Sequence, residues 1–289
     1  MSSTNAVGDD VAVLHPPPSR RVLRAFDVQD QAPEWLAGGQ RGAWRAGSTV
    51  LKRLDMSVAA LEWQADLLVE IDGAADLRVA PPVRASDGRL VVDGWTAWRY
   101  EPGVRPRARW SEVVGAGRAF HLALHGRPRP PFLDGRTDSW GVADRVAWGE
   151  TPSGSAAELP HLAAVFAALR PVRPESQLVH ADLTGNVHLH EGLPPLVIDL
   201  SLRWRPTAFA SAVVVVDALL FEGAGTELVD AVAAGEGPEF AQCLLRALVF
   251  RATTDHVLRP TDVAAQVATF GPTARTLLEH LGSTGHSAD

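Results

Sequence analysis

Lysine is almost absent from this chain of 289 residues: of its 27 lysine and arginine residues, only Lys52 is a lysine. Arginine serves for most surface roles, and its dominance suits a compositional bias of the genome. A planar, forked guanidinium cannot, however, replace a compact ammonium where a site needs a point charge. Lys52 is therefore a candidate functional residue.

Cysteine is equally scarce. Cys243 is the only one, which excludes a disulfide within the chain and favours a cytoplasmic location. An excess of positive charge is also missing, since the formal net charge is -7 and the pI is about 5.8. Proteins that bind the phosphate backbone of nucleic acids normally carry a basic surface. We therefore expect no nucleic-acid partner.

Long apolar runs are missing as well. The first apolar residues, Val11 to Leu14, are too few for the core of a signal peptide, and they lead into a run of prolines. The most apolar stretch, Ser211 to Phe221, is short and contains Asp217, which favours a buried helix over a membrane span. We therefore expect no membrane segment. We also expect the protein to be a monomer or a weak homodimer.

The length and the hydrophobic content of 46% suit two lobes with a sizeable core. The two ends, residues 1–19 and 283–289, are polar and are expected to be flexible. Between them, the character of the sequence changes at a linker rich in proline, glycine and arginine, residues 101–109. We expect an amino-terminal lobe over residues 20–101 and a carboxy-terminal lobe over residues 102–282.

The amino-terminal lobe has the pattern of short strands separated by turns. The predicted strands are Ala43–Ala46 and Thr49–Arg53 on either side of Gly47-Ser48, and residues 83–85 and 90–98 on either side of Asp87-Gly88. Apolar residues at helical spacing predict a helix over residues 57–71, which the side chain of Ser57 can cap.

The carboxy-terminal lobe is mainly helical by the same criteria. Helices are predicted over residues 110–125, 156–169, 208–222, 237–258 and 261–282. One β island interrupts them, with short strands over residues 178–179, 187–190 and 196–199. Together the two lobes predict an α+β fold, with a small β-rich lobe, a larger helical lobe and a ligand site in the cleft between them.

The candidate catalytic residues lie in the β island. The segment His180-Ala-Asp182-Leu-Thr-Gly-Asn186 is followed by Val197-Ile-Asp199. Phosphoryl transfer needs a carboxylate near the attacking hydroxyl and hard oxygen ligands that hold Mg²⁺ on the phosphates. Asp182 suits the first role as the catalytic residue, and Asn186 with Asp199 suits the second as metal ligands.

This segment resembles the catalytic loop of the aminoglycoside phosphotransferase, choline kinase and protein-kinase-like superfamily. In that superfamily His-x-Asp is followed by an Asn, and a metal-binding Asp follows about a dozen residues later. The chain departs from the pattern at one point, because Asn186 lies four residues after Asp182 where the family has five. Gly185 can accommodate the tighter turn.

The resemblance extends to the amino-terminal lobe and implies which residues bind the nucleotide. The glycine-rich segment between two strands is similar to the family's phosphate-covering loop, and Lys52 matches the lysine that contacts the α- and β-phosphates. Glu62 is expected to pair with Lys52, with Asp66 as the alternative, and the segment from Trp98 to Glu101 is expected to meet adenine. The implied nucleotide-binding residues are Gly38, Gly39, Gln40, Arg41, Gly42, Lys52, Glu62, Trp98 and Tyr100.

The resemblance implies a protein-kinase-like fold and an ATP-dependent kinase that uses ATP and Mg²⁺. Its acceptor would be a small molecule with a hydroxyl group, such as an aminoglycoside, a sugar or choline. Carboxylates that could line a cleft for a cationic acceptor, or form only solvated faces, are Glu222, Glu227, Asp230, Glu236 and Glu239. Asp217 is expected either to brace the catalytic loop or to lie on a helix surface.

Three other interpretations remain to be weighed. A catalytically silent, nucleotide-binding pseudokinase is compatible with the shortened loop. A metal hydrolase with a zinc site could use His180, His188 and His190 with Asp182 and Asp199. His188 and His190 share one face of a strand, but no third ligand has convincing spacing. The segment 42–49 has the spacing of a P-loop, but it carries Ser48 where the lysine must be and precedes a strand, so we reject that interpretation.

Overall fold

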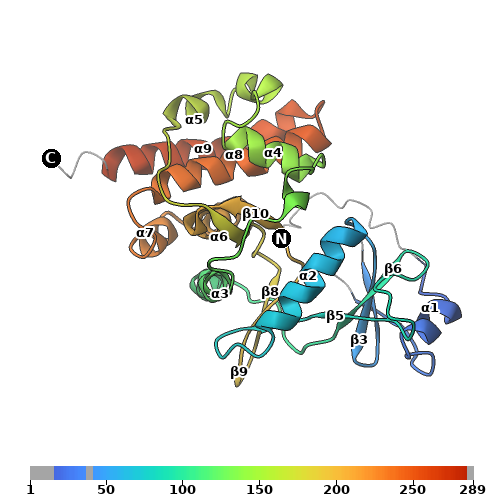
Figure 1. Cartoon of the computed structure of the whole chain (residues 1–289). Helices are drawn as coiled ribbons and strands as arrows, with labels where there is room; N and C mark the ends of the chain where they lie inside the picture. The colour runs from blue at the N-terminus through green and yellow to red at the C-terminus, as the bar shows by residue number, and fades with distance from the viewer. Residues whose placement is uncertain (1–15, 37–41, 285–289) are drawn as a thin grey trace, which may run out of the picture. The chain divides into compact units, whose positions relative to one another are not determined.

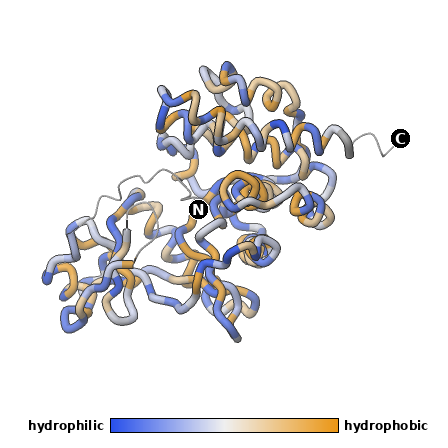
Figure 2. Tube along the Cα trace, turned by 180° about the vertical axis from the view of Figure 1, so that it is seen from behind, coloured by the Kyte–Doolittle hydropathy of each residue, from blue (hydrophilic) through white to orange (hydrophobic). Residues whose placement is uncertain are grey.

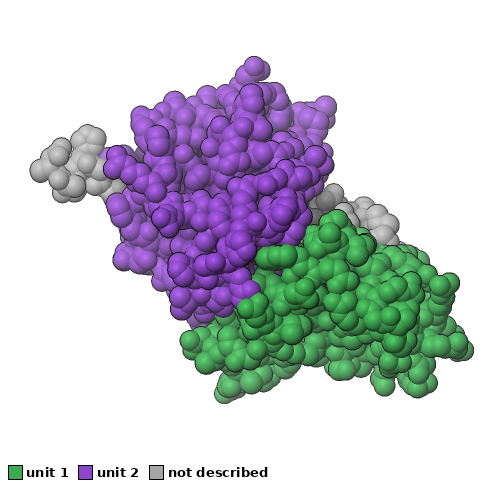
Figure 3. All heavy atoms as spheres, viewed as in Figure 1, with its two compact units in different colours: residues 1–104, 188–198 green, residues 105–187, 199–289 purple. Residues whose placement is uncertain are grey.

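The structure is a computed structural model that describes residues 16–36 and 42–284. The chain divides into two compact units (Figure 3). Unit 1 comprises residues 1–104 and 188–198, and unit 2 comprises residues 105–187 and 199–289. A segment from the middle of the chain therefore belongs to unit 1, although its neighbours in sequence belong to unit 2.

Unit 1 is built on a five-stranded antiparallel sheet with the order β1-β2-β3-β6-β5 (Figure 1). Its strands are β1 Glu34–Leu36, β2 Ala43–Ala46, β3 Thr49–Arg53, β5 Pro82–Val83 and β6 Trp95–Arg99. In β3 the side chain of Leu51 is fully buried in the core, and Lys52 points to the opposite face because side chains alternate along a strand. Lys52 is in register with Thr96 of β6.

Two helices pack on unit 1. Helix α1, Arg20–Ala25, contributes Val22 and Leu23 to a core cluster that also contains Leu51 and Trp95. Helix α2, Val58–Ile71, starts at Ser57, whose hydroxyl accepts a hydrogen bond from the backbone N–H of Ala60 at 3.2 Å, as an N-cap should.

The segment 188–198 joins unit 1 through backbone pairing. Strand β9, Leu193–Val197, pairs in parallel with β4, Arg78–Val79, and β8, Val187–His190, lies on the other side of β9 and completes a three-stranded sheet. A further bridge connects Leu189 with Val104. The pairing of β9 with β4 and the bridge from Leu189 to Val104 join residues more than 80 positions apart in sequence, so no local sequence pattern predicts them. Through these contacts the hairpin belongs to unit 1.

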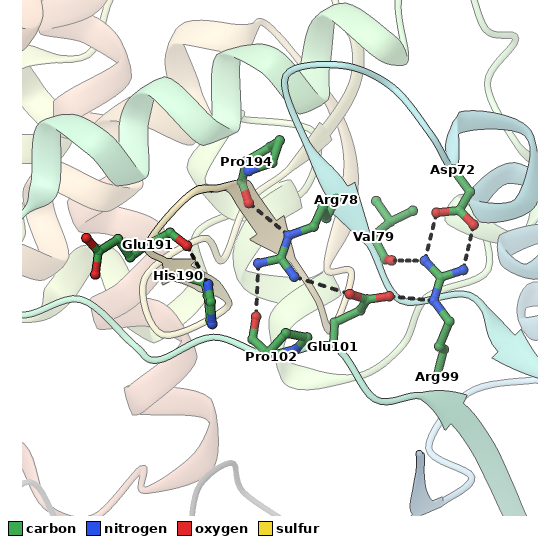
Figure 4. A network of polar contacts seen from close by, with 9 residues as sticks. All are labelled: Asp72, Arg78, Val79, Arg99, Glu101, Pro102, His190, Glu191 and Pro194. Atoms are coloured by element: carbon green, nitrogen blue, oxygen red, sulfur yellow. Dashed lines mark hydrogen bonds and ion pairs between the residues drawn. The ribbon is translucent and has the colours of Figure 1, made fainter.

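Two arginines, Arg78 and Arg99, connect the end of β6 with this hairpin and with the residue after α2 through hydrogen bonds (Figure 4). Arg99 donates to both carboxylate oxygens of Asp72, to the carbonyl of Val79 and to Glu101. Arg78 donates to Glu101 and to two carbonyl oxygens, those of Pro102 and Pro194. Glu101 is thus shared by two guanidinium groups, and its side chain is only 18% exposed.

Unit 2 is mainly helical. Its helices are α3 Trp110–Ala123, α4 Ser139–Ala147, α5 Ala163–Ala168, α6 Thr207–Phe221, α7 Glu227–Ala233, α8 Phe240–Leu258 and α9 Val263–Thr284, with short 3-10 turns at Pro131–Leu133 and Gly154–Glu158. Strand β7, Gln177–His180, pairs antiparallel with β10, Leu202–Arg205. Helix α6 is hydrophobic around its circumference (Figure 2), and its residues from Ala208 to Ala218 are all buried.

The most apolar stretch is thus a buried helix, as its sequence predicts. Over residues 16–36 and 42–284, none of the helices combines the length and the apolarity that crossing a membrane requires.

Several predicted elements differ in extent. The predicted strand 90–98 begins only at Trp95, because Asp93 and Gly94 both have positive φ, 50° and 76°, and turn the chain. The predicted helix 156–169 is interrupted at Pro160 and contains a 3-10 turn followed by α5. Helices α1, α4 and α7 and strands β4 and β10 are additional. In β10 the polar face of the strand, Arg203 and Arg205, is buried, whereas a sequence pattern would place it in solvent.

The arginine network of unit 1 yields a stability prediction. Glu101→Gln removes the charge that Arg78 and Arg99 share, and hydrogen bonds to charged groups contribute about 1.5–3 kcal/mol each. We expect urea unfolding to show a loss of about 1–3 kcal/mol in the free energy of unfolding. The control is Asp87→Asn, which removes an exposed Asp87–Arg89 pair and should leave stability close to that of the parent. Equal effects of the two substitutions would contradict the assigned role of Glu101.

Candidate active site

The predicted catalytic loop connects β7 to β8 and is anchored by alternate apolar residues. Ala181, Leu183 and Val187 are at most 1% exposed, and they leave the side chains of Asp182 and Asn186 partly exposed between them. The turn closes with hydrogen bonds from the N–H groups of Asn186 and Val187 to the carbonyl of Leu183, at 2.9 and 3.1 Å. A short apolar-polar alternation therefore holds two polar side chains at the surface of unit 2.

Gly185 makes the shortened loop possible. Its φ is 87°, in the left-handed region that glycine adopts at little cost. With this turn the side-chain nitrogen of Asn186 reaches back to Asp182, donating to its backbone carbonyl at 2.7 Å and to Oδ2 at 3.2 Å. The four-residue spacing thus still brings Asp182 and Asn186 together.

This arrangement suits the predicted metal role of Asn186. Because Nδ2 makes both hydrogen bonds to Asp182, the side-chain oxygen of Asn186 is left as the atom that can ligate a cation. The side-chain carbonyl of Asn186 and the carboxylate of Asp199 are hard oxygen donors of the kind that Mg²⁺ takes. Asp199, the second predicted ligand, is exposed and has a φ of 50°. Asn186 and Asp199 are therefore compatible with Mg²⁺ in their donor chemistry.

Asp182 also contacts an arginine that no motif in the sequence indicates. Arg251 of α8 donates from Nη2 to Oδ1 of Asp182 at 2.7 Å. It also binds Asp217 of α6 through Nε and Nη2, at 2.7 and 2.6 Å. Arg251 therefore links Asp217 to the loop, as the expected bracing by Asp217 requires.

The charges of this cluster are set by burial and by pairing. Burial raises the pKa of Asp217 above its ordinary value, and the Arg251 guanidinium opposes that rise. Burial would lower the pKa of Arg251, but Asp217 and Asp182 together raise it above its ordinary value. Arg251 therefore stays protonated beside Asp217.

Two buried histidines support the loop from the other side. Nδ1 of His180 accepts the backbone N–H of Asp182 at 3.2 Å, so His180 holds the backbone of the loop. The N–H of His180 in turn donates to Nε2 of His121 at 3.0 Å. Burial, with the neighbouring His180, lowers the pKa of His121 to about 3. His121 is therefore a neutral acceptor at physiological pH.

Among residues 16–36 and 42–284, no three His, Cys, Asp or Glu side chains come together as a metal site would require. His180, His188 and His190 therefore do not form such a group in the described part of the chain. His180 is fully buried, whereas His190 is exposed and bonds to the carbonyl of Glu191 (Figure 4).

The predicted nucleotide-binding residues lie in unit 1. Gly38, Gly39, Gln40 and Arg41 fall outside the described residues. Gly42 has a φ of 65°, and a Cβ there would lie 1.7 Å from the ring of Trp35, so only glycine fits. Lys52 is half-buried on β3, and its carbonyl accepts the hydroxyl of Thr96 at 3.2 Å.

The remaining predicted residues of unit 1 have identified partners. Both carboxylate oxygens of Glu62 accept hydrogen bonds from Arg84, at 2.7 and 3.4 Å, and the pairing with Lys52 stays a prediction. Trp98 packs against the cluster of Leu61 and donates its indole N–H to Thr96. The guanidinium of Arg45 lies 3.8 Å from the ring centre of Tyr100. Contacts of these residues with a nucleotide stay predictions.

The acidic residues considered for a cationic acceptor are largely engaged within the chain. Glu222 accepts hydrogen bonds from Arg105 and from the indole of Trp110. Three of the five carboxylates thus pair with cationic or imidazole side chains: Glu222 with Arg105, Glu236 with Arg118 and Asp230 with His280. These three are satisfied ion pairs or hydrogen bonds.

No protein-family model matches the sequence, and no curated protein sequence matches it. Solved structures do match. An aminoglycoside phosphotransferase from Alicyclobacillus acidocaldarius is 16% identical, with a TM-score of 0.59, over 93% of this chain and 97% of its own. A microcompartment-associated aminopropanol kinase is 19% identical, with a TM-score of 0.62, over 92% and 97% of the two chains.

An amicoumacin kinase, solved with AMP-PNP, Ca²⁺ and amicoumacin, is 18% identical, with a TM-score of 0.59, over 88% of this chain and 91% of its own. At these identities the likeness establishes the fold. The chain has the protein-kinase-like α+β fold of the aminoglycoside phosphotransferases and related small-molecule kinases, with a small β-rich part and a larger helical part. The predicted fold class is confirmed.

The depressed pKa of His121 predicts acid sensitivity. With a folded pKa of about 3 and an ordinary value near 6.5, the unfolded chain binds the extra proton between these pH values, so stability falls as the pH falls through this window. The limiting slope is about 1.4 kcal/mol per pH unit. His121→Gln keeps an acceptor for His180 and removes the titration. We expect urea unfolding between pH 6.5 and 4.5 to show a shallower slope for this variant than for the parent.

The control is His125→Gln, near the end of the same helix, where the side chain is exposed. This variant should keep the parental slope. A parental slope in His121→Gln would contradict the neutral, buried state of His121.

Proposed function

We propose, from the shared phosphotransferase fold and the geometry of its catalytic loop, that this chain is an ATP-dependent small-molecule kinase that phosphorylates an alcohol group. The observation that carries the proposal is the pairing of Asp182 with Asn186. A partly exposed carboxylate lies beside an amide oxygen that is free to ligate a cation. These are the two functions that a catalytic loop for phosphoryl transfer must combine.

In this function Asp182 orients the acceptor hydroxyl and accepts its proton as the oxygen attacks the γ-phosphorus of ATP. The side chain is 37% exposed, so an acceptor can reach it. Asn186 and Asp199 would hold Mg²⁺, which when bound neutralises charge on the phosphates. Lys52 would contact the α- and β-phosphates, and the glycine-rich segment from Gly38 to Gly42 would cover them.

The acceptor is a small hydroxyl compound. Solved structures of the same fold include kinases named for aminoglycosides, aminopropanol and amicoumacin. An ATP-consumption screen with aminoglycosides, amino alcohols, amino sugars and choline-like alcohols tests which class is used. A parent protein that binds MgATP and turns over none of these acceptors would favour the pseudokinase and overturn the enzyme assignment.

Asp182→Asn separates catalysis from nucleotide binding. The substitution keeps the shape of the side chain but removes its basicity and charge. We expect turnover to fall by about 100-fold or more, the usual scale for a general base, while the Kd for MgATP stays near that of the parent. The matched control is Asp134→Asn, which also breaks an Asp–Arg pair in unit 2, with Arg129, and should leave both quantities unchanged. Parental turnover in Asp182→Asn would remove Asp182 as the base.

Asp199→Asn tests the metal role. Asparagine tolerates a positive φ, so the backbone at φ 50° is kept while the charge is lost. We expect calorimetry to show Mg²⁺-dependent ADP binding weakened by about tenfold or more, because ligand charge tunes affinity for hard cations. Asp93→Asn is the control, since Asp93 is also exposed and also has a φ of 50°. Unchanged Mg²⁺ dependence in Asp199→Asn would exclude Asp199 as a ligand.

A further inference from the structure

An arginine from the distant helix α8 reaches the catalytic loop. Arg251 lies 69 residues beyond Asp182 in sequence, and its Nη2 donates to Oδ1 of Asp182 at 2.7 Å. The Arg251 side chain is only 8% exposed, whereas that of Asp182 is 37% exposed. A buried cation therefore contacts a carboxylate that remains accessible.

The same guanidinium is fixed in place by Asp217. Nε and Nη2 of Arg251 bind the two carboxylate oxygens of Asp217 at 2.7 and 2.6 Å, and the Asp217 side chain is 5% exposed. Such a two-point contact between planar groups sets the orientation of the guanidinium as well as its position. The inner pair Arg251–Asp217 is thus a rigid base for the outer contact with Asp182.

Aromatic rings restrict Arg251 further. Its Cζ lies 5.5 Å from the ring centre of Trp140 in α4 and 5.4 Å from that of Phe250. These distances are in the range of cation–π attraction. The guanidinium is therefore confined by a ring of α4 and by the neighbouring ring of its own helix, besides its pairing with Asp217 on α6.

Arg251 could neutralise Asp217 without its third bond, the one to Asp182. One guanidinium balances one carboxylate, and the bidentate pair alone satisfies both oxygens of Asp217. The additional bond from Nη2 fixes Oδ1 of Asp182, while Asn186 contacts Oδ2 at 3.2 Å. Each carboxylate oxygen has two lone pairs, so an acceptor hydroxyl can still bond to Asp182.

We propose that Arg251 is a positioning residue for the catalytic base: anchored by Asp217, it holds the Asp182 carboxylate in the orientation that receives the acceptor hydroxyl. This inference rests on the proposed kinase function. It assigns to Arg251 an effect on turnover and none on nucleotide binding, because the residue of the proposed site that Arg251 contacts is Asp182.

The test compares Arg251→Lys with the parent in three measurements: kcat with an active acceptor, the Kd for MgATP and thermal unfolding. Lysine keeps the charge beside Asp217 but cannot bind two carboxylates with a planar fork. We expect kcat to fall by about 10- to 100-fold, since a misplacement near 1 Å costs on that order, with the Kd for MgATP unchanged. The matched control is Arg246→Lys, on the same helix and 7% exposed, which contacts Gln242 and Arg170 and should keep the parental kcat.

Asp217→Asn is the second variant, for the case in which Arg251→Lys does not fold. It removes the anchor's charge and leaves Asp182 and Arg251 intact, and we expect kcat to fall by at least about threefold with the Kd for MgATP unchanged.

Parental kcat in folded Arg251→Lys, or in Asp217→Asn, would overturn the positioning role. Parallel loss of turnover and MgATP binding would also overturn it, because it indicates a structural role. A parent protein without turnover on any acceptor is a different result: it removes the proposed function itself, and it is seen before any variant is compared.

Discussion

A carboxylate in the middle of the most apolar helix is the constraint on which the helical unit depends. Asp217 lies on α6, where every residue from Ala208 to Ala218 is buried. An unpaired charge in such surroundings would lower the free energy of unfolding by several kcal/mol, so the carboxylate requires a cationic partner. Arg251 of α8 supplies that cation, and the pair fixes how α6 and α8 face each other. The loop of Asp182 then attaches to the same guanidinium, so the position of this proposed base depends on a contact between helices.

Guanidinium groups perform comparable tasks elsewhere in the chain. In unit 2, Arg205 of β10 pairs with both Asp144 and Glu150, and so ties a strand to α4 and the turn after it. In unit 1, Arg78 and Arg99 share Glu101. A planar group with five donors can bind two or three acceptors on different segments, which a lysine ammonium does less specifically. The arginine-rich composition thus has a structural use, whatever its origin.

The elements predicted from sequence are those with strong local signals. The strands Ala43–Ala46 and Thr49–Arg53 have the predicted bounds, and α2 begins directly after its capping serine. The strand predicted over residues 90–98 is wrong in its first half, because Asp93 adopts a positive φ that a non-glycine residue rarely takes. Strand β10 is missed for another reason: its arginines are buried, and Arg205 is stabilised there by Asp144 of α4, which no local pattern reveals.

The sequence by itself determined the local structure of the predicted catalytic loop. Apolar residues at 181, 183 and 187 and a glycine at 185 suffice to expose Asp182 and to turn Asn186 back onto it, since all these contacts span a few residues. Only the tertiary structure decided which cation holds Asp182 and to which unit the hairpin 188–198 belongs. Both depend on contacts between residues far apart in sequence, 69 residues in the case of Asp182 and Arg251. Such contacts leave no periodicity in the sequence, because they depend on how whole elements pack. For the contact of Arg251, the local sign in the sequence is a charged residue within an apolar helix, at Asp217 and again at Arg251.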